Sequence, residues 1–222
     1  MENKLAFFDF CGTIIKFQTA DRFIDFCSKN LKFNNTFVGY IHKILNKLRI
    51  LSVLTKFFPL CAISKRLKLL IIRGIPYEKL EKLAERYYIE ELKPAIILSV
   101  VSEMTKKKKN GYKIWIVSGG YDIYIKYFIA DFHLDGLIAT QIRFNKKGYC
   151  CGRIAGIDCM NTNKVKMIEE KISNIKKSTT FAYSDSISDI SLLKWVENGV
   201  VVSKNKSQLW AKKNNLEEIV WI

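Results

Sequence analysis

The chain has 222 residues, of which 49% are hydrophobic, and it carries a formal net charge of +16. This length and apolar content suffice for one packed domain, or for one domain with an insert. No stretch of about 20 uncharged apolar residues occurs, which argues against a membrane-spanning helix. Six cysteines without CxxC spacing, and an N-terminus without a signal-peptide pattern, predict a reduced, cytoplasmic protein.

The positive charge by itself does not indicate a nucleic-acid partner. Lysines are scattered along the chain, and the four at 106–109 look like the solvated end of a helix. The basic, aromatic-interleaved motifs of known nucleic-acid modules are missing from the sequence. We therefore attribute the charge to general composition, with attraction of an anionic substrate as its useful consequence.

Strands and helices alternate over most of the chain. Strands are predicted at 5–8, 113–117, 136–140, 180–182 and 199–202, and helices at 122–132, 165–172 and 187–196. This alternation predicts an α/β fold with a parallel sheet covered on both faces. The runs 142–148 and 150–157 add a β-hairpin with its turn at Lys147-Gly148.

Residues 16–93 interrupt this alternation and are predicted to form a helical insert. Its helices are predicted at 20–29, 38–48, 62–72 and 77–87, with breaks at Pro59 and Pro76. The apolar and basic stretch 48–72 has an alternative interpretation as a membrane-surface helix. Pro59 interrupts that stretch, and packing within the insert explains its apolar residues. We therefore prefer the interpretation as part of the helical insert to that as a membrane-surface helix.

Acidic residues follow two of the predicted strands. Asp9 comes after the first strand, before Gly12-Thr13, and Asp185 and Asp189 come after the strand at 180–182. Carboxylates at the C-terminal ends of parallel strands converge on one crevice, where they can hold a hard divalent cation. An aspartate in such a place can also attack a phosphoryl group.

Two further motifs provide groups that bind anions. Ser118-Gly119-Gly120 follows a strand and precedes a helix, so its hydroxyl and N–H groups predict an anion cradle. Lys164 lies at the front of a helix, where its ammonium can neutralise a phosphate and an attacking carboxylate together. Lys166 and, less well placed, Lys171 are its rivals.

Taken in order, these motifs resemble the haloacid dehalogenase superfamily, specifically its phosphoserine-phosphatase-like branch (subfamily IB). Each motif alone is weak, but the four span residues 9–189 in the family's order. The resemblance implies a Rossmann-like, doubly wound core of residues 1–15 and 94–222. It also implies a helical cap of residues 16–93, inserted after the first strand.

The resemblance further implies roles for single residues. Asp9 would be the nucleophile that becomes an aspartyl-phosphate, in a loop ordered by Thr13. Mg²⁺ would be held by Asp9, Asp185 and the main-chain carbonyl of Cys11, with Asp189 supporting the metal site. The residues expected to contact phosphate or substrate are Ser118, Gly119, Lys164, Gln18 and Ser188.

The sequence departs from the branch at two positions. Cys11 stands where the branch has a second aspartate, the general acid and base. A protonated thiol can donate a proton but activates water poorly, which would favour a phosphoryl acceptor other than water unless something compensates. Gln18 replaces a glutamate that meets the substrate ammonium, and Lys68, with Arg66 close by, lies near the position of the arginine that meets the substrate carboxylate.

We therefore expect a Mg²⁺-dependent phosphomonoester hydrolase acting on a small phosphorylated alcohol, polyol or amino alcohol. The alternatives are a phosphotransferase to a non-water acceptor, an L-phosphoserine phosphatase and, less favoured, a non-catalytic phosphate-binding protein. Oligomeric state does not follow from the sequence.

Overall fold

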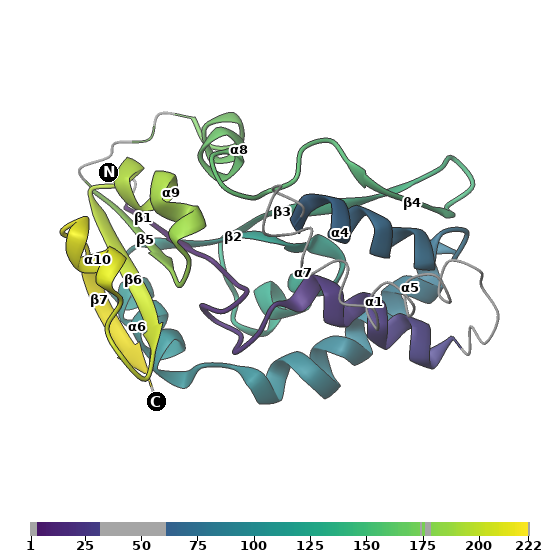
Figure 1. The fold of residues 1–222 in the computed structure, drawn as a ribbon, viewed down its shortest axis with the longest axis horizontal. Helices are drawn as coiled ribbons and strands as arrows, with labels where there is room; N and C mark the ends of the chain where they lie inside the picture. Colours follow the sequence, from purple (N-terminus) through teal and green to yellow (C-terminus); the bar gives the residue numbers. More distant parts are fainter. Residues whose placement is uncertain (1–3, 32–60, 174, 176–178, 222) are drawn as a thin grey trace.

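A seven-stranded sheet forms the centre of the computed structural model, which describes residues 4–31, 61–173, 175 and 179–221 (Figure 1). The strand order is β4-β3-β2-β1-β5-β6-β7, and every neighbouring pair is parallel except β3 with β4. The strands are β1 Leu5–Phe8, β2 Lys113–Tyr121, β3 Gly136–Phe144, β4 Cys150–Ala155, β5 Thr180–Ser184, β6 Asn198–Lys204 and β7 Glu217–Trp221. The predicted α/β fold with a mainly parallel sheet is confirmed.

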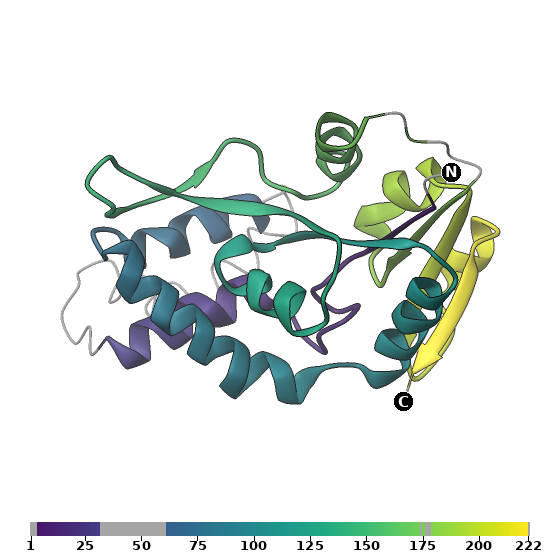
Figure 2. The same cartoon turned by 180° about the vertical axis from the view of Figure 1, so that it is seen from behind.

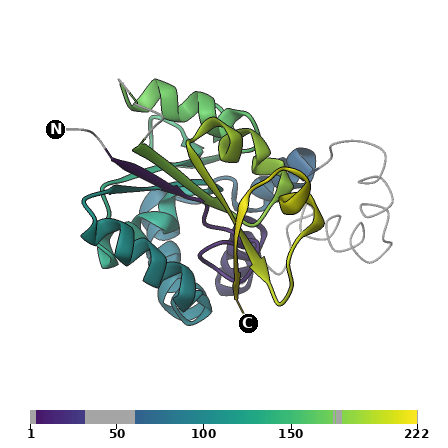
Figure 3. The same cartoon turned by 90° about the vertical axis from the view of Figure 1, so that its left-hand side faces the viewer.

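Helices cover both faces of this sheet, as Figure 3 shows with the sheet seen from one end. The α-helices are α1 Thr19–Asn30, α4 Cys61–Leu69, α5 Tyr77–Tyr87, α6 Leu98–Lys109, α7 Asp122–Asp131, α8 Asn163–Lys171, α9 Ile190–Trp195 and α10 Leu209–Lys213. Shorter helical turns are η1 Leu70–Ile72, η2 Tyr88–Leu92, η3 Lys93–Ala95 and η5 Ile187–Asp189.

All four residues of β1 are buried, because the strand has a hydrophobic core on each side. Successive side chains of a strand point to opposite faces of the sheet. Leu5 and Phe7 therefore join one apolar cluster with α8 and α9, whereas Ala6 and Phe8 join a second with α6, α7 and the insert. This placement fixes β1, and with it Asp9, at the centre of the molecule.

Several elements differ from their predicted bounds. β2 continues through Ser118-Gly119-Gly120, with a register shift against β3 between Ser118 and Tyr121, so this motif is irregular strand rather than a plain turn. β3 is one long strand that runs from the sheet into the hairpin. β7 was not predicted: it is an edge strand that begins with two glutamates, and its side chains are mostly partly exposed.

The insert packs on the same apolar cluster as one face of the sheet. Leu69, Ile71 and Ile72 are buried there, together with Phe23 and Leu80. The stretch proposed as a membrane-surface helix therefore has at least three apolar side chains, those of Leu69, Ile71 and Ile72, buried inside the protein. The helix predicted at 38–48 lies outside the described residues, and so do 48–60. None of the described helices has the length and hydropathy needed to cross a bilayer.

The segment after η1 pairs with the β3–β4 hairpin through its backbone. Gly74 N donates to Cys150 O at 2.8 Å, and Cys150 N donates to Ile75 O at 2.8 Å. Tyr77 N then donates to Gly148 O at 2.8 Å. Figures 1 and 2 show the hairpin extending from the sheet along the insert. Pro76 and Tyr149 form an isolated antiparallel bridge within this pairing, so residues 74–77 join the insert to the hairpin.

Candidate active site

Asp9 lies directly after β1, at the C-terminal edge of the parallel sheet. Its backbone N–H donates to Tyr183 O of β5 at 2.9 Å, and only 5% of the residue is exposed. Both carboxylate oxygens have partners: Lys164 Nζ lies 2.6 Å from Oδ1, and Thr13 Oγ1 lies 3.1 Å from Oδ2. A single orientation of this carboxylate is thereby selected.

A tight turn brings Asp185 against the loop that follows Asp9. Gly12 has a φ of +85°, a conformation that favours glycine. A Cβ at this position would lie 2.2 Å from Asp185 Oδ2, so a larger residue would displace the carboxylate. Thr13 connects the two acids, because its Oγ1 accepts from Asp185 N at 3.0 Å and lies 3.2 Å from Asp185 Oδ1.

Lys164 joins the two acidic motifs from the first turn of α8. Its Nζ donates to Asp9 Oδ1 and to Asp189 Oδ2, at 2.6 Å each. Ser184 Oγ donates to the same oxygen of Asp189 at 2.6 Å. Segments that are 155 and 25 residues away from Lys164 in the sequence therefore meet at one ammonium group.

Burial and mutual repulsion shift the pKa values of these groups. Burial raises the pKa of Asp9, although the ammonium of Lys164 opposes this shift. Burial lowers the pKa of Lys164, but the charges of Asp9 and Asp189 more than reverse this and leave it raised. Burial, and then the charge of Asp9, raise the pKa of Asp185 to about 7. Two carboxyl groups thus contact one ammonium, and a third, that of Asp185, is connected to Asp9 through Thr13.

This surplus of acid fits a divalent cation. A cation between Asp9 and Asp185 would favour the ionised form of both and remove the repulsion that raises the Asp185 pKa. Within the described ranges, no group of three or more His, Cys, Asp or Glu side chains is arranged to hold a metal. The expected set contains only two carboxylates and a main-chain oxygen, which suits Mg²⁺ because this ion keeps several waters.

The Cys11 thiol belongs to a hydrogen-bonded chain that was not anticipated. Its Sγ lies 2.9 Å from Thr19 Oγ1 and 3.6 Å from Ser118 Oγ. Thr19 Oγ1 in turn lies 2.7 Å from the hydroxyl of Tyr124. Burial, and then the charge of Asp9, raise the pKa of Cys11, so its sulfur is a protonated thiol at neutral pH.

The phosphate-cradle motif is held from two sides. Gly120 N donates to Ser118 Oγ at 3.0 Å, and the carbonyl of the same peptide, Gly119 O, accepts from Lys65 Nζ at 2.6 Å. Lys65 belongs to α4 of the insert, is 5% exposed, and also donates to Asp158 Oδ1 at 2.5 Å and to Thr140 Oγ1 at 3.2 Å. It was not singled out from the sequence, because a lone lysine in a helix carries no motif.

The other expected substrate residues are less closely tied to Asp9. Gln18 is exposed, and its Nε2 reaches Cys11 O at 3.5 Å. Ser188 is exposed and bonds to Ser186, with 2.9 Å between the two hydroxyl oxygens. Lys68 is 9% exposed, and its Nζ pairs with Asp21 Oδ2 at 2.8 Å within the insert.

Comparisons with known proteins identify the family of this chain. The family model of haloacid dehalogenase-like hydrolases matches residues 6–194. A phosphoserine phosphatase of Methanocaldococcus jannaschii is 28% identical over 165 residues, which cover 71% of this chain and 74% of that protein.

Solved structures show the same fold. A protein with unknown function from Bordetella pertussis Tohama I matches with a TM-score of 0.82 at 17% identity, over 99% of each chain. A substrate-bound phosphoserine phosphatase matches with a TM-score of 0.65 at 21% identity, over 99% of this chain and 93% of the other. The chain therefore belongs to the haloacid dehalogenase-like hydrolases, and within that family it is similar to phosphoserine phosphatases.

Proposed function

We propose that this phosphatase hydrolyses a small phosphorylated alcohol, polyol or amino alcohol in a Mg²⁺-dependent reaction with Asp9 as the nucleophile. The observation that carries the proposal is the convergence of distant segments on Asp9. Lys164 and Thr13 each hold one of its oxygens, and Thr13 also bonds Asp185. A fixed carboxylate beside a fixed cation is what in-line attack on phosphorus requires.

In the first step an oxygen of Asp9 forms a bond to phosphorus, and the bond from phosphorus to the substrate oxygen breaks. Ser118 Oγ, Gly119 N–H and the Lys164 ammonium bind the phosphoryl oxygens and stabilise their charge. Mg²⁺, when bound by Asp9, Asp185 and the Cys11 carbonyl, would add its positive charge to theirs. The product is an alcohol and an aspartyl-phosphate, and Asp189 keeps Lys164 in place.

Cys11 is the proposed proton donor to the leaving oxygen. Its raised pKa keeps the proton on the sulfur, and its sulfur lies 3.6 Å from Ser118 Oγ at the phosphate cradle. Donating this proton leaves a thiolate, and its raised pKa favours taking a proton back from solvent. Once protonated again, the thiol cannot accept a proton from water in the second step. This observation supports a second candidate function, in which the phosphoryl group of Asp9 passes to an alcohol instead of water.

The substrate is proposed to be different from L-phosphoserine. Lys68, which lies near the position of the arginine that meets the substrate carboxylate, already has a carboxylate partner in Asp21. Gln18 has no charge to offer a substrate ammonium. A substrate without an amino-acid head group fits these two residues better. A cytoplasmic location remains a prediction.

The assignment is tested by Asp9→Asn, which keeps the size of the side chain and removes its nucleophilic charge. We expect Mg²⁺-dependent phosphate release from a panel of small phosphomonoesters to fall at least about 10³-fold, with an unchanged circular dichroism spectrum. Asp25→Asn, on the exposed side of α1, is the matched control and should leave activity unchanged. Equal phosphate release by wild type and Asp9→Asn would reject Asp9 as the nucleophile.

Cys11→Asp separates hydrolysis from transfer. An aspartate here would restore a general base, so we expect hydrolysis to rise by roughly 10–100-fold, within the usual range for acid–base catalysis. Product analysis with added glycerol would then show less glycerol phosphate relative to free phosphate than the wild type forms. A large loss of both products would instead mean that the thiol is specifically required.

A further inference from the structure

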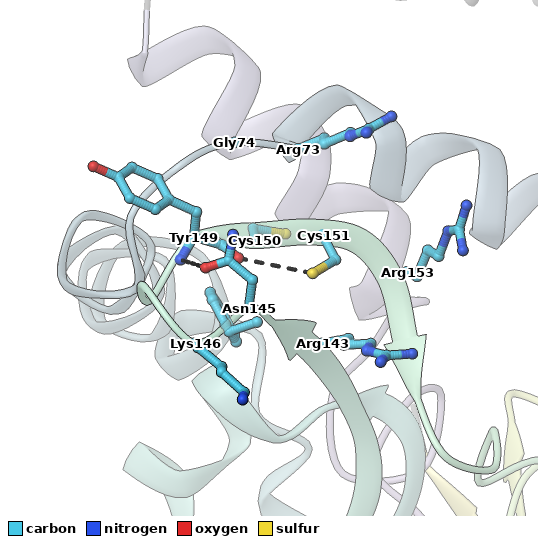
Figure 4. Close-up of a pocket in the computed structure, with 10 residues that line it drawn as sticks. Arg73, Gly74, Arg143, Asn145, Lys146, Tyr149, Cys150, Cys151 and Arg153 are labelled. Carbon is cyan, nitrogen blue, oxygen red and sulfur yellow. Dashed lines mark hydrogen bonds between the residues drawn. The ribbon is translucent and has the colours of Figure 1, made fainter.

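A cavity among the described residues lies away from Asp9, between the segment after η1 and the β3–β4 hairpin (Figure 4). Its volume is about 650 Å³, within the size range of small-molecule sites. It contains none of the residues assigned to catalysis. Its lining consists of Arg73, Gly74, Arg143, Phe144, Asn145, Lys146, Tyr149, Cys150, Cys151 and Arg153.

The charged lining of this cavity is entirely cationic. Arg73, Arg143, Lys146 and Arg153 are exposed, and no aspartate or glutamate lines the cavity with them. None of these four side chains takes part in an ion pair in the described part of the chain. Their positive charges are therefore left for a ligand to neutralise.

General composition does not account for this cluster. The sequence contains 30 lysines but only seven arginines, and three of the seven line this one cavity. Arginine differs from lysine in offering a planar fork of donors that binds phosphate with two parallel hydrogen bonds. A chain that otherwise uses lysine for its positive charge thus places arginine where it is suited to hold an anion.

Local backbone features bring the arginines together. Arg143 lies at the register shift between Ile142 and Phe144, and such bulges redirect side chains. Gly152 has a φ of +67°, and a Cβ there would lie only 3.0 Å from Arg73 Cβ. The missing side chain lets Arg73, which comes from the insert, pack directly on β4.

Figure 4 shows the side chains of Arg73, Arg143 and Arg153 extending toward the same side of the hairpin, whereas Tyr149 points the other way. Like charges on adjacent strands repel each other, which lowers the stability of the folded protein, and a bound anion would remove this repulsion. We propose that this cavity, hereafter the arginine pocket, binds a small anion that carries two or more phosphate groups. Such a ligand would connect the insert, through Arg73, to the hairpin, through Arg143 and Arg153.

The test is calorimetric titration of the intact protein with inorganic triphosphate. EDTA is present, so that divalent metal does not recruit the anion to Asp9. We expect one site per chain and at least about tenfold weaker binding by Arg143→Ala/Arg153→Ala, because each lost charge-assisted pair is a strong one. The matched control, Lys109→Ala/Lys213→Ala, removes two positive charges from exposed positions on α6 and α10 and should change the affinity less than twofold.

A second variant separates charge from geometry and guards against misfolding. Arg143→Lys/Arg153→Lys keeps the charge but loses the planar fork, so we expect binding weaker than wild type and stronger than the alanine pair. No triphosphate binding by the wild type, or equal weakening in the pocket and control variants, would overturn the proposal. The latter result would mean that the net charge of +16 attracts the anion without a defined site.

Discussion

Two buried lysines use their ammonium groups differently in this fold. Lys164, 3% exposed, is held between two carboxylates at the candidate active site, and a third carboxylate, that of Asp185, lies close by. Lys65, 5% exposed, pairs with one carboxylate among the described residues, that of Asp158, and it also donates to a carbonyl and a hydroxyl. One cluster keeps a surplus of negative charge and the other is neutral.

The difference in charge balance separates a cluster suited to bind a cation, around Lys164, from a structural ion pair, around Lys65. In the Lys65–Asp158 pair the two charges cancel and the ammonium is hydrogen-bonded, so the pair does not attract a charged ligand. A cluster with excess acid can be neutralised by a bound cation or by protonation of one carboxylate. The pKa of Asp185 is raised, first by burial and then by the charge of Asp9, which favours its protonation until a cation binds. Charge balance, more than burial of the lysine, thus distinguishes Lys164 at the candidate active site from Lys65 in the insert.

The largest expected effect is that of Lys164→Met on stability. This change leaves Asp9 and Asp189 buried without a counter-charge, which should cost about 3–5 kcal/mol of unfolding free energy. Urea unfolding in EDTA measures the loss. The neighbouring exposed Lys166→Met should change stability by less than about 0.5 kcal/mol. Similar small losses for both variants would mean that Lys164 is not the group that neutralises these acids.

A smaller effect is expected for Lys65→Met, about 1–3 kcal/mol, because Asp158 keeps its bond from Thr140 Oγ1 at 2.6 Å. Since this pair is balanced, Asp158→Asn in the same chain should recover much of the loss. The control Lys68→Met breaks a pair whose Asp21 side chain is 45% exposed, and should cost less than about 1 kcal/mol. If the second substitution adds to the loss instead, the balanced-pair interpretation fails.

The smallest effect concerns pH and metal. The pKa of Asp185 is about 7 in the folded protein, against a reference value of 3.8. Near pH 6 its carboxyl group is therefore protonated in the folded protein and ionised in the unfolded chain. In EDTA, stability should therefore fall as pH rises from 6 to 8, by about 1 kcal/mol or roughly 2–4 °C in melting temperature. Mg²⁺ should restore it at pH 8.

Asp185→Asn checks this prediction directly. The variant has no carboxylate to ionise, so it should lose this part of the pH dependence and most of the stabilisation by Mg²⁺. Thermal unfolding at both pH values, with and without Mg²⁺, measures the two effects. Equal stabilisation of the variant and the wild type by Mg²⁺ would place the metal away from Asp185.

The sequence predicted what depends on local pattern. β1 is a short apolar run followed by Asp9, and α5 spans the predicted residues 77–87. Both could be predicted because the apolar pattern of a buried strand or of a helix face involves only residues close in sequence. The resemblance likewise predicted that Lys164 lies with Asp9. It did not predict the bond from Lys164 to Asp189, which was expected to support the metal site. The half-exposed edge strand β7 lacked the apolar signal that makes such a prediction possible.

What the sequence could not reveal depends on contacts between distant residues. Lys65 meets Gly119 and Asp158, which are 54 and 93 residues away, and no spacing rule connects them. Thr19 meets Tyr124 across 105 residues, and only the folded chain shows that both lie beside Cys11. Similarly, the three arginines of the arginine pocket are ordinary surface residues until the hairpin and the insert come together.

The backbone pairing of residues 74–77 with residues 148–150 has a practical consequence for dissecting this protein. Deleting the insert would remove the partners of Cys150 N–H, Cys150 C=O and Gly148 C=O. An uncovered strand of this kind recruits other chains and promotes aggregation. A minimal version of the enzyme would therefore need a replacement segment, or charged and proline substitutions along the hairpin, to stay monodisperse.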